Sequence, residues 1–526
     1  MSQVNFNHQM PMSDFDRDAF LKRRDHRMHT SGSPHSADWN PYMGMPGSFQ
    51  RRFGQRMPYV GRMDMAWTVM LFKQGLVEED TARRLLEVLP ETQQEGGWGG
   101  EEWLKKKLDG DEDTASAVNY GRTLQEPMHR MQMRDALLEV FDEAHDALAD
   151  LLDMAELHAE SMMAGQSHFS HAQPTTYGAY LLAVHEGLFR GLKQLELAYT
   201  ETNRNSGGCG ACSGTGWPVD RDMITDLLGF DGTIELAYDC EASQDEIPQI
   251  LFALSSLTLT LSRSAMDHSI WALEEMGMIE VAPEWQGLSS FMPQKAHSGM
   301  FENVRVACDE VIGEMMKTAI TYKGESIQDV LTVFKAPKYV HSSTGWTVQA
   351  LGFFRRLVRS ATVHTTRMEQ IVRDGYSGAP DLAILLIREK NYGGRQAHRI
   401  CSNFVRLARE RGIHPSHTTA ALLDEAAGVT EEPAPHLTDE QVRSAMTFER
   451  FFETHCNKGD PCPSETRRMV AERREQLDAL RQAQTQRREK LRYADRRLEA
   501  EVQRITGRRT PVFAAAEDGA SAETSK

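Results

Sequence analysis

The feature that most constrains the fold is a series of long helical patterns in the middle of the chain. Apolar residues recur in them at spacings of three and four, which is the pattern of an amphipathic helix. The predicted helices are Arg134–Met163, Tyr177–Thr202, Ile247–Met278, Glu302–Tyr322 and Thr344–Arg373. Several approach or exceed about 25 residues without a strong breaker, and helices of that length favour a bundle over an α/β sheet. The sequence therefore predicts an all-α protein with a central long-helix bundle.

One predicted helix is apolar on more than one face. The stretch from Ile247 to Leu261 carries apolar residues around most of the helix. A helix of this kind is buried on several sides. Neighbouring subunits are one way to provide that burial.

The chain changes character on both sides of these helices. Residues 1–62 show no helical period, and Met63–Leu89 carries two helical patterns before a glycine-rich break at 96–100. Beyond residue 374 shorter helices are predicted, and a serine is placed to cap the last of them. These helices are Pro380–Lys390, Arg395–Gly412 and Ser416–Ala427.

The last helical pattern, residues 464–505, is rich in Arg, Glu and Gln and has few large apolar residues. It is interpreted as a solvated or subunit-spanning helix, followed by a disordered tail. We therefore divide the chain into an N-terminal extension (1–62), an N-terminal helical domain (63–113), a central long-helix bundle domain (114–372), a C-terminal helical domain (373–485) and a helical extension with the tail (486–526).

The composition narrows the functional classes. The 526 residues carry a net charge of −17, whereas a general nucleic-acid-binding protein should be basic. No apolar run approaches the ~20 residues that span a bilayer, and the first residues lack the apolar core of a signal peptide. Seven cysteines without regular spacing fit a reducing compartment. We expect a cytoplasmic protein that binds neither nucleic acid nor membrane.

Two of the cysteines, Cys209 and Cys212, form a CxxC motif in a glycine-rich turn. A redox or zinc role is open, but no second pair or histidine cluster follows at zinc spacing. Packing of small residues is the favoured interpretation. No phosphate loop, dinucleotide fingerprint or metal motif is present.

The stretch from Ser289 to Glu302, SSFMPQKAHSGMFE, is the strongest functional candidate. Its Met-Pro pair blocks a continuous helix, because proline lacks a backbone donor and restricts the residue before it. Lys295 and His297 follow, and a helical pattern starts near Phe301. From the residues alone, a polar surface loop and a functional loop are about equally favoured.

This stretch resembles the signature loop of the fumarase/aspartase superfamily, GSSxMPxKxN followed by a glutamate. Ser289, Ser290, Met292, Pro293, Lys295 and Glu302 match it, whereas Leu288 stands for the glycine and His297 for the asparagine. Further segments resemble those of argininosuccinate lyases in the same order along the chain. They are Gly165–Pro174 (GQSHFSHAQP), Gly208–Arg221 with its PVDR end, and Asp381-Leu-Ala with Arg395-Gln-Ala-His398.

The resemblance implies a three-domain fold whose long helices form a multi-helix core in a homotetramer, with active sites shared between subunits. It implies a lyase that eliminates a leaving group β to a carboxylate of a small dicarboxylate, cleaving a carbon–nitrogen bond and releasing fumarate or a similar acid, without a cofactor or metal. By resemblance Ser289 is the general base and His168 is the general acid or orients it. Glu302 would hold His168; His171 and His297 stay open as proton donors.

The resemblance also suggests substrate-binding residues. Lys295 would supply positive charge, and backbone amides near Ser290 and Met292 would donate to developing charge. The other candidates are His297, Ser167, Gln244, Arg122, Thr123 and Gln125. Arg122-Thr123-Leu124-Gln125 stands where the family has an R-S-R-N clamp, and Ser243-Gln244-Asp245 stands where argininosuccinate lyases have D-R-D. An exposed helix start remains the alternative interpretation for Thr123 and Gln125.

Two arginines of the family's pocket are therefore missing. Each charge-assisted contact contributes roughly 1.5–3 kcal/mol, so argininosuccinate should bind poorly unless other residues compensate. We expect a lyase for a different N-substituted aspartate. A carbon–oxygen or other carbon–heteroatom lyase, including one of the nitrosuccinate type, is the alternative on the same scaffold. An inactive scaffold or binding protein is the third, against which the retained Ser289, Lys295, His168 and Glu302 argue.

Overall fold

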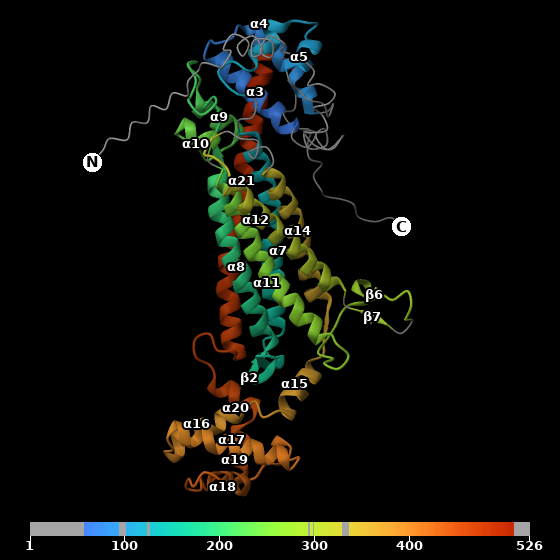
Figure 1. Ribbon diagram of the computed structural model, residues 1–526, viewed down its shortest axis with the longest axis vertical. Coiled ribbons are helices and arrows are strands. Elements are labelled where there is room, and N and C mark those ends of the chain that lie inside the picture. Colours follow the sequence, from blue (N-terminus) through green and yellow to red (C-terminus); the bar gives the residue numbers. More distant parts are fainter. Residues whose placement is uncertain are drawn as a thin grey trace, which may run out of the picture. The chain divides into compact units, whose positions relative to one another are not determined.

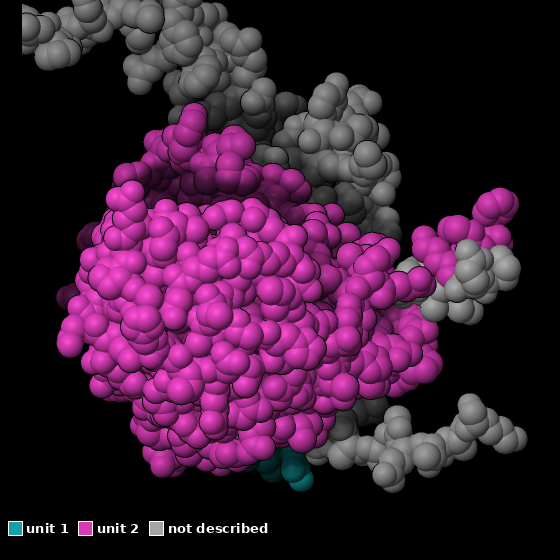
Figure 2. Space-filling model, turned by 90° about the horizontal axis from the view of Figure 1, so that it is seen from below, with its two compact units in different colours: residues 1–128, 216–228, 495–526 teal, residues 129–215, 229–494 magenta. Residues whose placement is uncertain are grey.

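The computed structural model describes residues 57–93, 101–123, 127–242, 244–292, 295–297, 299–328 and 336–509. The chain divides into two compact units. Unit 1 holds residues 1–128, 216–228 and 495–526, and unit 2 holds residues 129–215 and 229–494 (Figure 2). The predicted all-α class is confirmed: helices dominate the described residues, and their strands form only two-stranded pairs.

Unit 2 is built around long helices that run side by side (Figure 1). They are α7 (Met128–Leu157), α8 (Tyr177–Thr202), α11 (Glu246–Trp271), α12 (Met300–Tyr322), α14 (Pro337–Ser360) and α21 (Pro463–Thr506). Helix α11 lies at the centre, because it packs against α8, α12 and α14. The unit boundary falls within α21, after Ala494.

The core of the bundle is apolar and aromatic. Tyr177, Phe301, Phe354 and Leu254 are buried within it, and full burial of each such apolar side chain contributes roughly 1.5–3 kcal/mol. Apolar residues of α11 also face outward: Phe252 is 59% exposed. The multi-faced apolar pattern of this helix therefore has one face in the core of its own chain and another outside it.

Three predicted helices are wrong at their ends, and one of them, predicted over Ile247–Met278, stops at Trp271 as α11. Helix α7 ends at Leu157, and Met162 and Met163 begin strand β1 (Met162–Ser167), which pairs antiparallel with β2 (Ser170–Thr176). Apolar residues at helical spacing thus continue into a strand that is itself buried, because both structures use apolar positions to face the core.

The predicted helix Thr344–Arg373 is two helices. Helix α14 stops at Ser360, and α15 (Thr365–Asp374) begins after the short strand β8 (Thr362–Val363). Strand β8 pairs with β5 (Ile279–Glu280), which follows the end of α11 at Trp271. The backbone amides and carbonyls of β8 form hydrogen bonds with β5, so they are not available to the hydrogen bonds of a continuous helix.

The C-terminal part of unit 2 contains shorter helices. They are α16 (Ala379–Lys390), α17 (Gly394–Glu410), a 3₁₀ turn at Pro415–His417, α18 (Ala420–Gly428), α19 (Asp439–Ala445) and α20 (Phe448–Thr454). The predicted cap at Ser416 is wrong. Thr419 caps α18 instead, since its hydroxyl accepts the Leu422 amide at 3.3 Å. Ser416 lies in the 3₁₀ turn.

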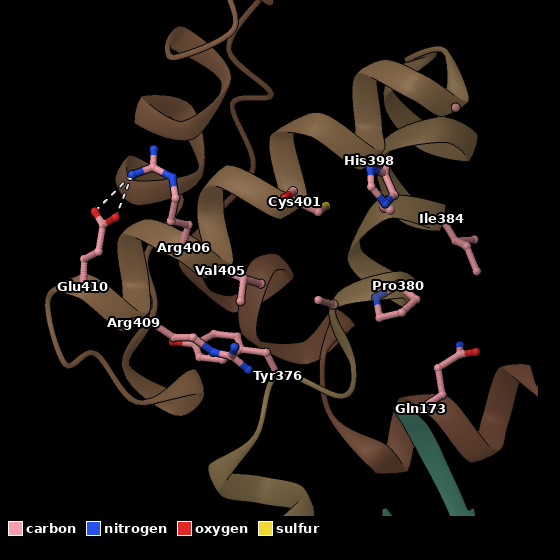
Figure 3. Close-up of a pocket in the computed structure, with 14 residues that line it drawn as sticks. Gln173, Tyr376, Pro380, Ile384, His398, Cys401, Val405, Arg406, Arg409 and Glu410 are labelled. Atoms are coloured by element: carbon pink, nitrogen blue, oxygen red, sulfur yellow. Dashed lines mark hydrogen bonds and ion pairs between the residues drawn. The ribbon is translucent and has the colours of Figure 1, made fainter. Parts of the chain in front are cut away.

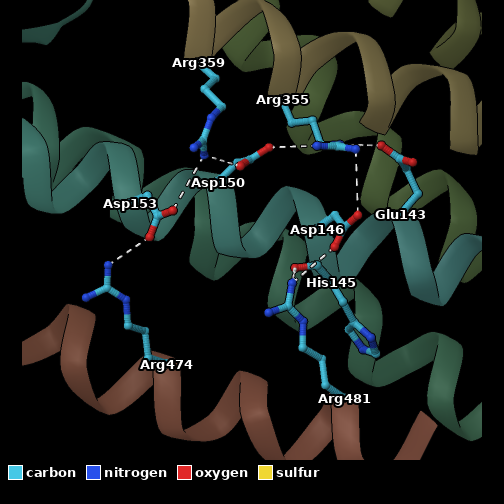
Figure 4. A network of polar contacts seen from close by, with 9 residues as sticks. All are labelled: Glu143, His145, Asp146, Asp150, Asp153, Arg355, Arg359, Arg474 and Arg481. Atoms are coloured by element: carbon cyan, nitrogen blue, oxygen red, sulfur yellow. Dashed lines mark hydrogen bonds and ion pairs between the residues drawn. The ribbon is translucent and has the colours of Figure 1, made fainter. Parts of the chain in front are cut away.

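Helix α21 is less solvated than its sequence suggests. Val470 and Leu477 belong to the bundle core. Its basic residues form ion pairs with α7, among them Arg474 with Asp153 and Arg481 with Asp146 (Figure 4). Helix α14 also forms ion pairs with α7. Arg355 pairs with Glu143 and Asp150, and Arg359 pairs with Asp150.

Unit 1 contains α3 (Met57–Lys73), α4 (Glu79–Val88), a 3₁₀ turn at Leu89–Gln93, α5 (Glu101–Lys107), α6 (Glu112–Ala117) and α9 (Arg221–Leu228). Trp67 is fully buried in it. The remaining short elements belong to unit 2: β3 (Arg204–Asn205), β4 (Gly232–Thr233), α10 (Ala237–Ala242), a 3₁₀ turn at Pro283–Trp285, β6 (Gly287–Leu288) and β7 (Ala296–His297). Among the described helices, none has both the length and the apolar character that crossing a bilayer requires.

Candidate functional site

The candidate catalytic loop is the connection of a small hairpin in unit 2. Strand β6 pairs antiparallel with β7, with Gly287 opposite His297 and Leu288 opposite Ala296. Figure 1 shows this hairpin standing away from the helices of the bundle. Helix α12 starts three residues after β7, at Met300. The loop is therefore carried by a hairpin that stands away from the bundle, close before the start of α12.

The hydroxyl oxygen of Ser289 accepts two backbone hydrogen bonds within this loop. The amide of Met292 donates to it at 2.9 Å and the amide of Phe291 at 3.3 Å. Amide donors favour the negatively charged form of an acceptor oxygen. The arrangement can therefore stabilise an alkoxide at Ser289. Of the amides expected near Ser290 and Met292, the Met292 amide is one of the two donors.

The other side chains of the loop are open to solvent. Ser290, Met292 and Lys295 are exposed, and Phe291 is 89% exposed. Within the described residues Lys295 has no ion-pair partner. An exposed ammonium group on this loop is suited to an incoming anion. For His297 the structure describes only the backbone, which lies in β7.

His168 lies at the tip of the β1–β2 hairpin, whose last register pair is Ser167 opposite Ser170. Both tip residues are left-handed, with φ of 53° at His168 and 57° at Phe169. Two consecutive left-handed residues make a type I′ turn, the tight turn that matches strand twist. His168 is exposed and Phe169 is 90% exposed. The turn thus presents the imidazole away from its own chain, as it does the neighbouring Ser167.

Glu302 lies in the first turn of α12 and is exposed. Within the part of the chain that the structure describes, no hydrogen bond or ion pair joins Ser289, His168 and Glu302. One chain therefore presents the three predicted catalytic residues on three separate outward-facing segments.

The clamp residues lie near the end of the first segment of unit 1, residues 1–128. Thr123 is half-buried, and Gln125 lies outside the described residues. Arg122 is buried: its Nε donates to the Val118 carbonyl at 3.0 Å and its guanidinium pairs with Asp64. Burial raises the pKa of Asp64, and the Arg122 charge acts against that rise. Arg122 therefore has a structural partner, which argues against its predicted role in substrate binding.

Gln244 is buried just before α11. The Tyr322 hydroxyl, at the end of α12, donates to its Oε1 at 3.5 Å. Two residues later, Glu246 pairs with Arg130 of α7 at 3.1 Å, and both side chains are buried. Burial raises the pKa of Glu246, while Arg130 lowers it. This polar cluster links the ends of three bundle helices.

Sequence reasoning missed Arg130, Glu246 and Tyr322. The available signal was their position: each lies in the first or last turn of a long, mainly apolar helix. In a sequence, a charged or polar residue at a helix end looks like a solvated residue. Only its pairing in the three-dimensional structure shows that it is buried.

A groove lies between α16, α17 and strand β2 (Figure 3), with a volume of about 920 Å³. Gln173 of the predicted AQP segment and His398 of the predicted RQAH segment both line it. The Arg409 guanidinium lies 5.8 Å from the Tyr376 ring centre, and Arg406 pairs with Glu410 at 2.9 Å. Ser289, His168 and Lys295 do not line this groove. The groove therefore brings together two of the segments that resemble argininosuccinate lyases, but it does not include the candidate catalytic residues.

The described residues contain no cluster of three or more His, Cys, Asp or Glu side chains suited to a metal ion. Cys209 of the CxxC motif packs with Ile234 and Cys240 in a small apolar cluster, and Cys212 is left-handed, with φ of 71°. The favoured interpretation of small-residue packing is confirmed for Cys209.

Comparison with known proteins finds similar lyases. A model of the family described as Lyase matches residues 77–313. The argininosuccinate lyase of Methanocaldococcus jannaschii is 27% identical over 431 residues, covering 79% of this chain and 87% of the relative. That of Methanothrix thermoacetophila is 28% identical over 458 residues, covering 84% and 92%.

Solved structures share the fold. EDDS lyase, in complex with formate and as a variant with bound fumarate, is 25% identical, with a TM-score of 0.80, covering 86% of this chain and 92% of that protein. A class II fumarase from Schistosoma mansoni is 14% identical, with a TM-score of 0.61, covering 75% of this chain and 90% of the fumarase. The chain is therefore similar to argininosuccinate lyases and to EDDS lyase, and it has the fold of fumarase/aspartase-type lyases.

Proposed function

We propose that this protein is a carbon–nitrogen lyase that eliminates an amine from an N-substituted aspartate and releases fumarate. The observation that carries the proposal is the environment of Ser289, whose oxygen accepts the amides of Phe291 and Met292. The difficult step of such an elimination is removal of a proton from carbon beside a carboxylate. Amide donors that stabilise an alkoxide make a serine able to take that proton.

The other groups have complementary roles. Removing the proton pushes charge onto the neighbouring carboxylate, and the ammonium of exposed Lys295 would stabilise that charge. His168 protonates the departing nitrogen or orients the group that does. Glu302 would hold the imidazole of His168 and fix its tautomer. Such acid–base groups typically contribute roughly 10²- to 10⁴-fold to the rate.

The substrate differs from argininosuccinate in this proposal. Gln244 stands where argininosuccinate lyases have an arginine, and it is buried with Tyr322 as its partner. The neutral amide of Gln244 and the phenol of Tyr322 cannot form the charged contacts that an arginine at this position would form. They therefore favour a substrate whose amine substituent carries less charge than that of argininosuccinate. Thr123, Gln125, Ser167 and His297 would complete the binding of the two carboxylates.

The site is shared between subunits of a homotetramer in this proposal. Outward-facing apolar residues recur every seven positions on α11, at Phe252, Leu259 and Met266. Helix α12 adds Val306 and Ile320 on its own exposed face. Apolar stripes on neighbouring long helices are typical of a helix-packing interface. Assembly through them would bring His168, Ser289 and Thr123 of different chains together.

The test of the chemistry is Ser289→Ala. We expect turnover to fall by roughly 10²- to 10⁴-fold, because a positioned acid or base contributes about that much. The matched control is Ser402→Ala, an exposed serine on α17, which should keep wild-type activity. Light scattering should show the same assembly for all three proteins. A Ser289→Ala rate near wild type would remove serine as the base.

The test of the substrate is a panel of N-succinyl amines, argininosuccinate, aspartate, malate and nitrosuccinate, followed by fumarate absorbance and run in reverse with fumarate and amines. We expect turnover of an N-succinyl amine other than argininosuccinate. Preference for malate or nitrosuccinate would favour the other lyase types, and no turnover at all would favour a binding protein.

A further inference from the structure

The groove between α16, α17 and β2 has no part in the proposed lyase chemistry (Figure 3). All of its lining residues belong to unit 2. Its volume of about 920 Å³ falls in the range of sites that enclose small organic molecules. The residues that line it therefore indicate which kind of molecule it can hold.

The walls of the groove are mainly apolar. The apolar lining residues are Ala379, Pro380, Ala383 and Ile384 of α16, and Cys401 and Val405 of α17. On α17 the lining residues recur at spacings of three and four from Gly394 to Arg409, so they form one face of the helix. This face is about 22 Å long, because an α-helix rises ~1.5 Å per residue. The groove thus suits an elongated apolar body.

One end of this face carries a positive charge, the guanidinium of Arg409. It lies over the ring of Tyr376, 5.8 Å from the ring centre. The Tyr376 hydroxyl donates to the Ile413 carbonyl at 2.6 Å, which holds the ring in place. A guanidinium that lies over a ring keeps its in-plane N–H donors available. The ring therefore positions the cation without using its hydrogen bonds.

Arg409 differs in this respect from other arginines of α17. Arg406, which also lines the groove, pairs with Glu410 at 2.9 Å, and Arg399 pairs with Glu432 at 2.5 Å. Within the part of the chain that the structure describes, no ion pair or hydrogen bond involves the Arg409 guanidinium. An apolar groove that ends at such a cation complements a molecule with an apolar body and one negative end.

We propose that this groove binds a small organic monocarboxylate with an elongated apolar body. The body lies between α16 and α17, against Ile384 and Val405, and the carboxylate accepts hydrogen bonds from Arg409. The planar guanidinium matches the two oxygens of a carboxylate. A second carboxylate along the body would lose water against apolar walls without a partner, which is unfavourable. The site is therefore not one for the dicarboxylate of the proposed lyase reaction, and it does not depend on that reaction.

The first test measures binding of 4-phenylbutyrate to the full-length protein by isothermal titration calorimetry, beside its neutral analogue 4-phenylbutanamide. We expect one 4-phenylbutyrate per chain, and binding of the amide to be weaker by roughly fivefold, since Arg409 is exposed and an exposed ion pair contributes little more. In Arg409→Gln the preference for the acid should disappear. The matched control, Arg399→Gln, removes the same charge from the same helix outside the groove and should keep the preference.

Two results of this titration would overturn the proposal. One is the absence of 4-phenylbutyrate binding up to its solubility limit. The other is an unchanged preference for the acid in Arg409→Gln.

A second pair of variants tests where the apolar body lies. Ile384 lines the groove and is 41% exposed, whereas Ile387 of the same helix does not line it and is 39% exposed. Both positions can take a charged side chain without burying it. We expect Ile384→Glu to weaken 4-phenylbutyrate binding at least about tenfold, because its carboxylate repels the probe and removes an apolar contact. Ile387→Glu should bind as wild type does. Equal affinities of the two variants would place the probe elsewhere.

Two further measurements separate this groove from other binding sites. Lys295→Ala and saturating fumarate should leave 4-phenylbutyrate binding unchanged, and loss of binding in either case would move the probe to the lyase site and overturn the proposal. Light scattering should give the same molar mass with and without the probe. A fall in mass on adding 4-phenylbutyrate would mean that a second chain occupies the groove, which would also overturn it.

Discussion

His268 is a fully enclosed titratable side chain of the bundle. It lies on α11, is fully buried and contacts the rings of Trp271, Phe301 and Phe354. Its Nδ1 lies 2.7 Å from the Ser264 carbonyl, which can only accept, so Nδ1 carries the proton. Nε2 then accepts from the Tyr177 hydroxyl at 2.8 Å. Both nitrogens are satisfied only in the neutral imidazole.

This arrangement predicts a pH dependence of stability. Burial lowers the pKa of His268 from its ordinary 6.5 to about 4, which corresponds to roughly 3 kcal/mol. Between pH 6.5 and 4 the unfolded chain binds a proton at this site and the folded chain does not, so stability falls as pH falls. We expect the melting temperature to drop through this window, and the drop to be shallower in His268→Gln. The exposed His398→Gln should keep the wild-type slope.

At the scale of elements, α7 is held to α14 by ion pairs along one acidic face (Figure 4). Arg355 donates to Glu143 at 2.5 Å and to Asp150 at 2.9 Å, and its side chain is 19% exposed. Arg359 reaches the same Asp150 but is 55% exposed. Arg355 and Arg359 therefore make similar ion pairs, but solvent screens the pair of Arg359 more strongly.

We therefore expect Arg355→Ala to lower the free energy of unfolding by roughly 2 kcal/mol, because it leaves the half-buried Glu143 carboxylate without its ion-pair partner and leaves Asp150 with Arg359 alone. Arg359→Ala should cost at most about 1 kcal/mol. Denaturant titration of both variants, followed by circular dichroism, measures the difference. Equal losses would mean that burial of the Arg355 pair adds nothing.

The elements also show what sequence can and cannot supply. The bounds of α8 follow directly from its apolar period, because every turn of it packs against a neighbour. The end of α7 and the break between α14 and α15 do not, since they depend on strand pairing, of β1 with its neighbour β2 in the first case and of β8 with the distant β5 in the second. The candidate loop was found by its motif, yet neither the Phe291 donor to Ser289 nor the Asp64 partner of Arg122 has a sequence signature.

At the scale of the whole molecule, the apolar stripe on α11 predicts the assembly. Leu259 is 47% exposed at the middle of the helix. In an interface, a carboxylate at this position would be buried without a partner, which is strongly unfavourable. We expect Leu259→Glu to have a lower molar mass by light scattering, to lose activity and to keep its helical circular dichroism. The control Ile387→Glu, on the exposed face of α16, should keep the wild-type mass. An unchanged mass for Leu259→Glu would place the interface elsewhere.

If the sites are shared between the subunits of a homotetramer, as proposed, mixed assemblies give a further prediction. His168→Gln and Ser289→Ala should each be inactive alone, but a tetramer holding both kinds of chain contains some sites with neither change. If each site takes its histidine and its serine from different chains, random mixing in equal amounts restores about a quarter of the sites. The mixture is denatured and refolded together, and its turnover is compared with that of wild type treated in the same way.

The matched control for this experiment mixes Ser289→Ala with Lys295→Ala. Both residues lie on one loop of one chain, between β6 and β7, so every loop in the mixture carries one of the two changes. No site is then intact, and we expect no recovery. Recovery in neither mixture would mean that His168 and Ser289 serve the same site from a single chain. Because one chain presents them on separate exposed segments, with no described contact between them, recovery in the first mixture alone is the expected result.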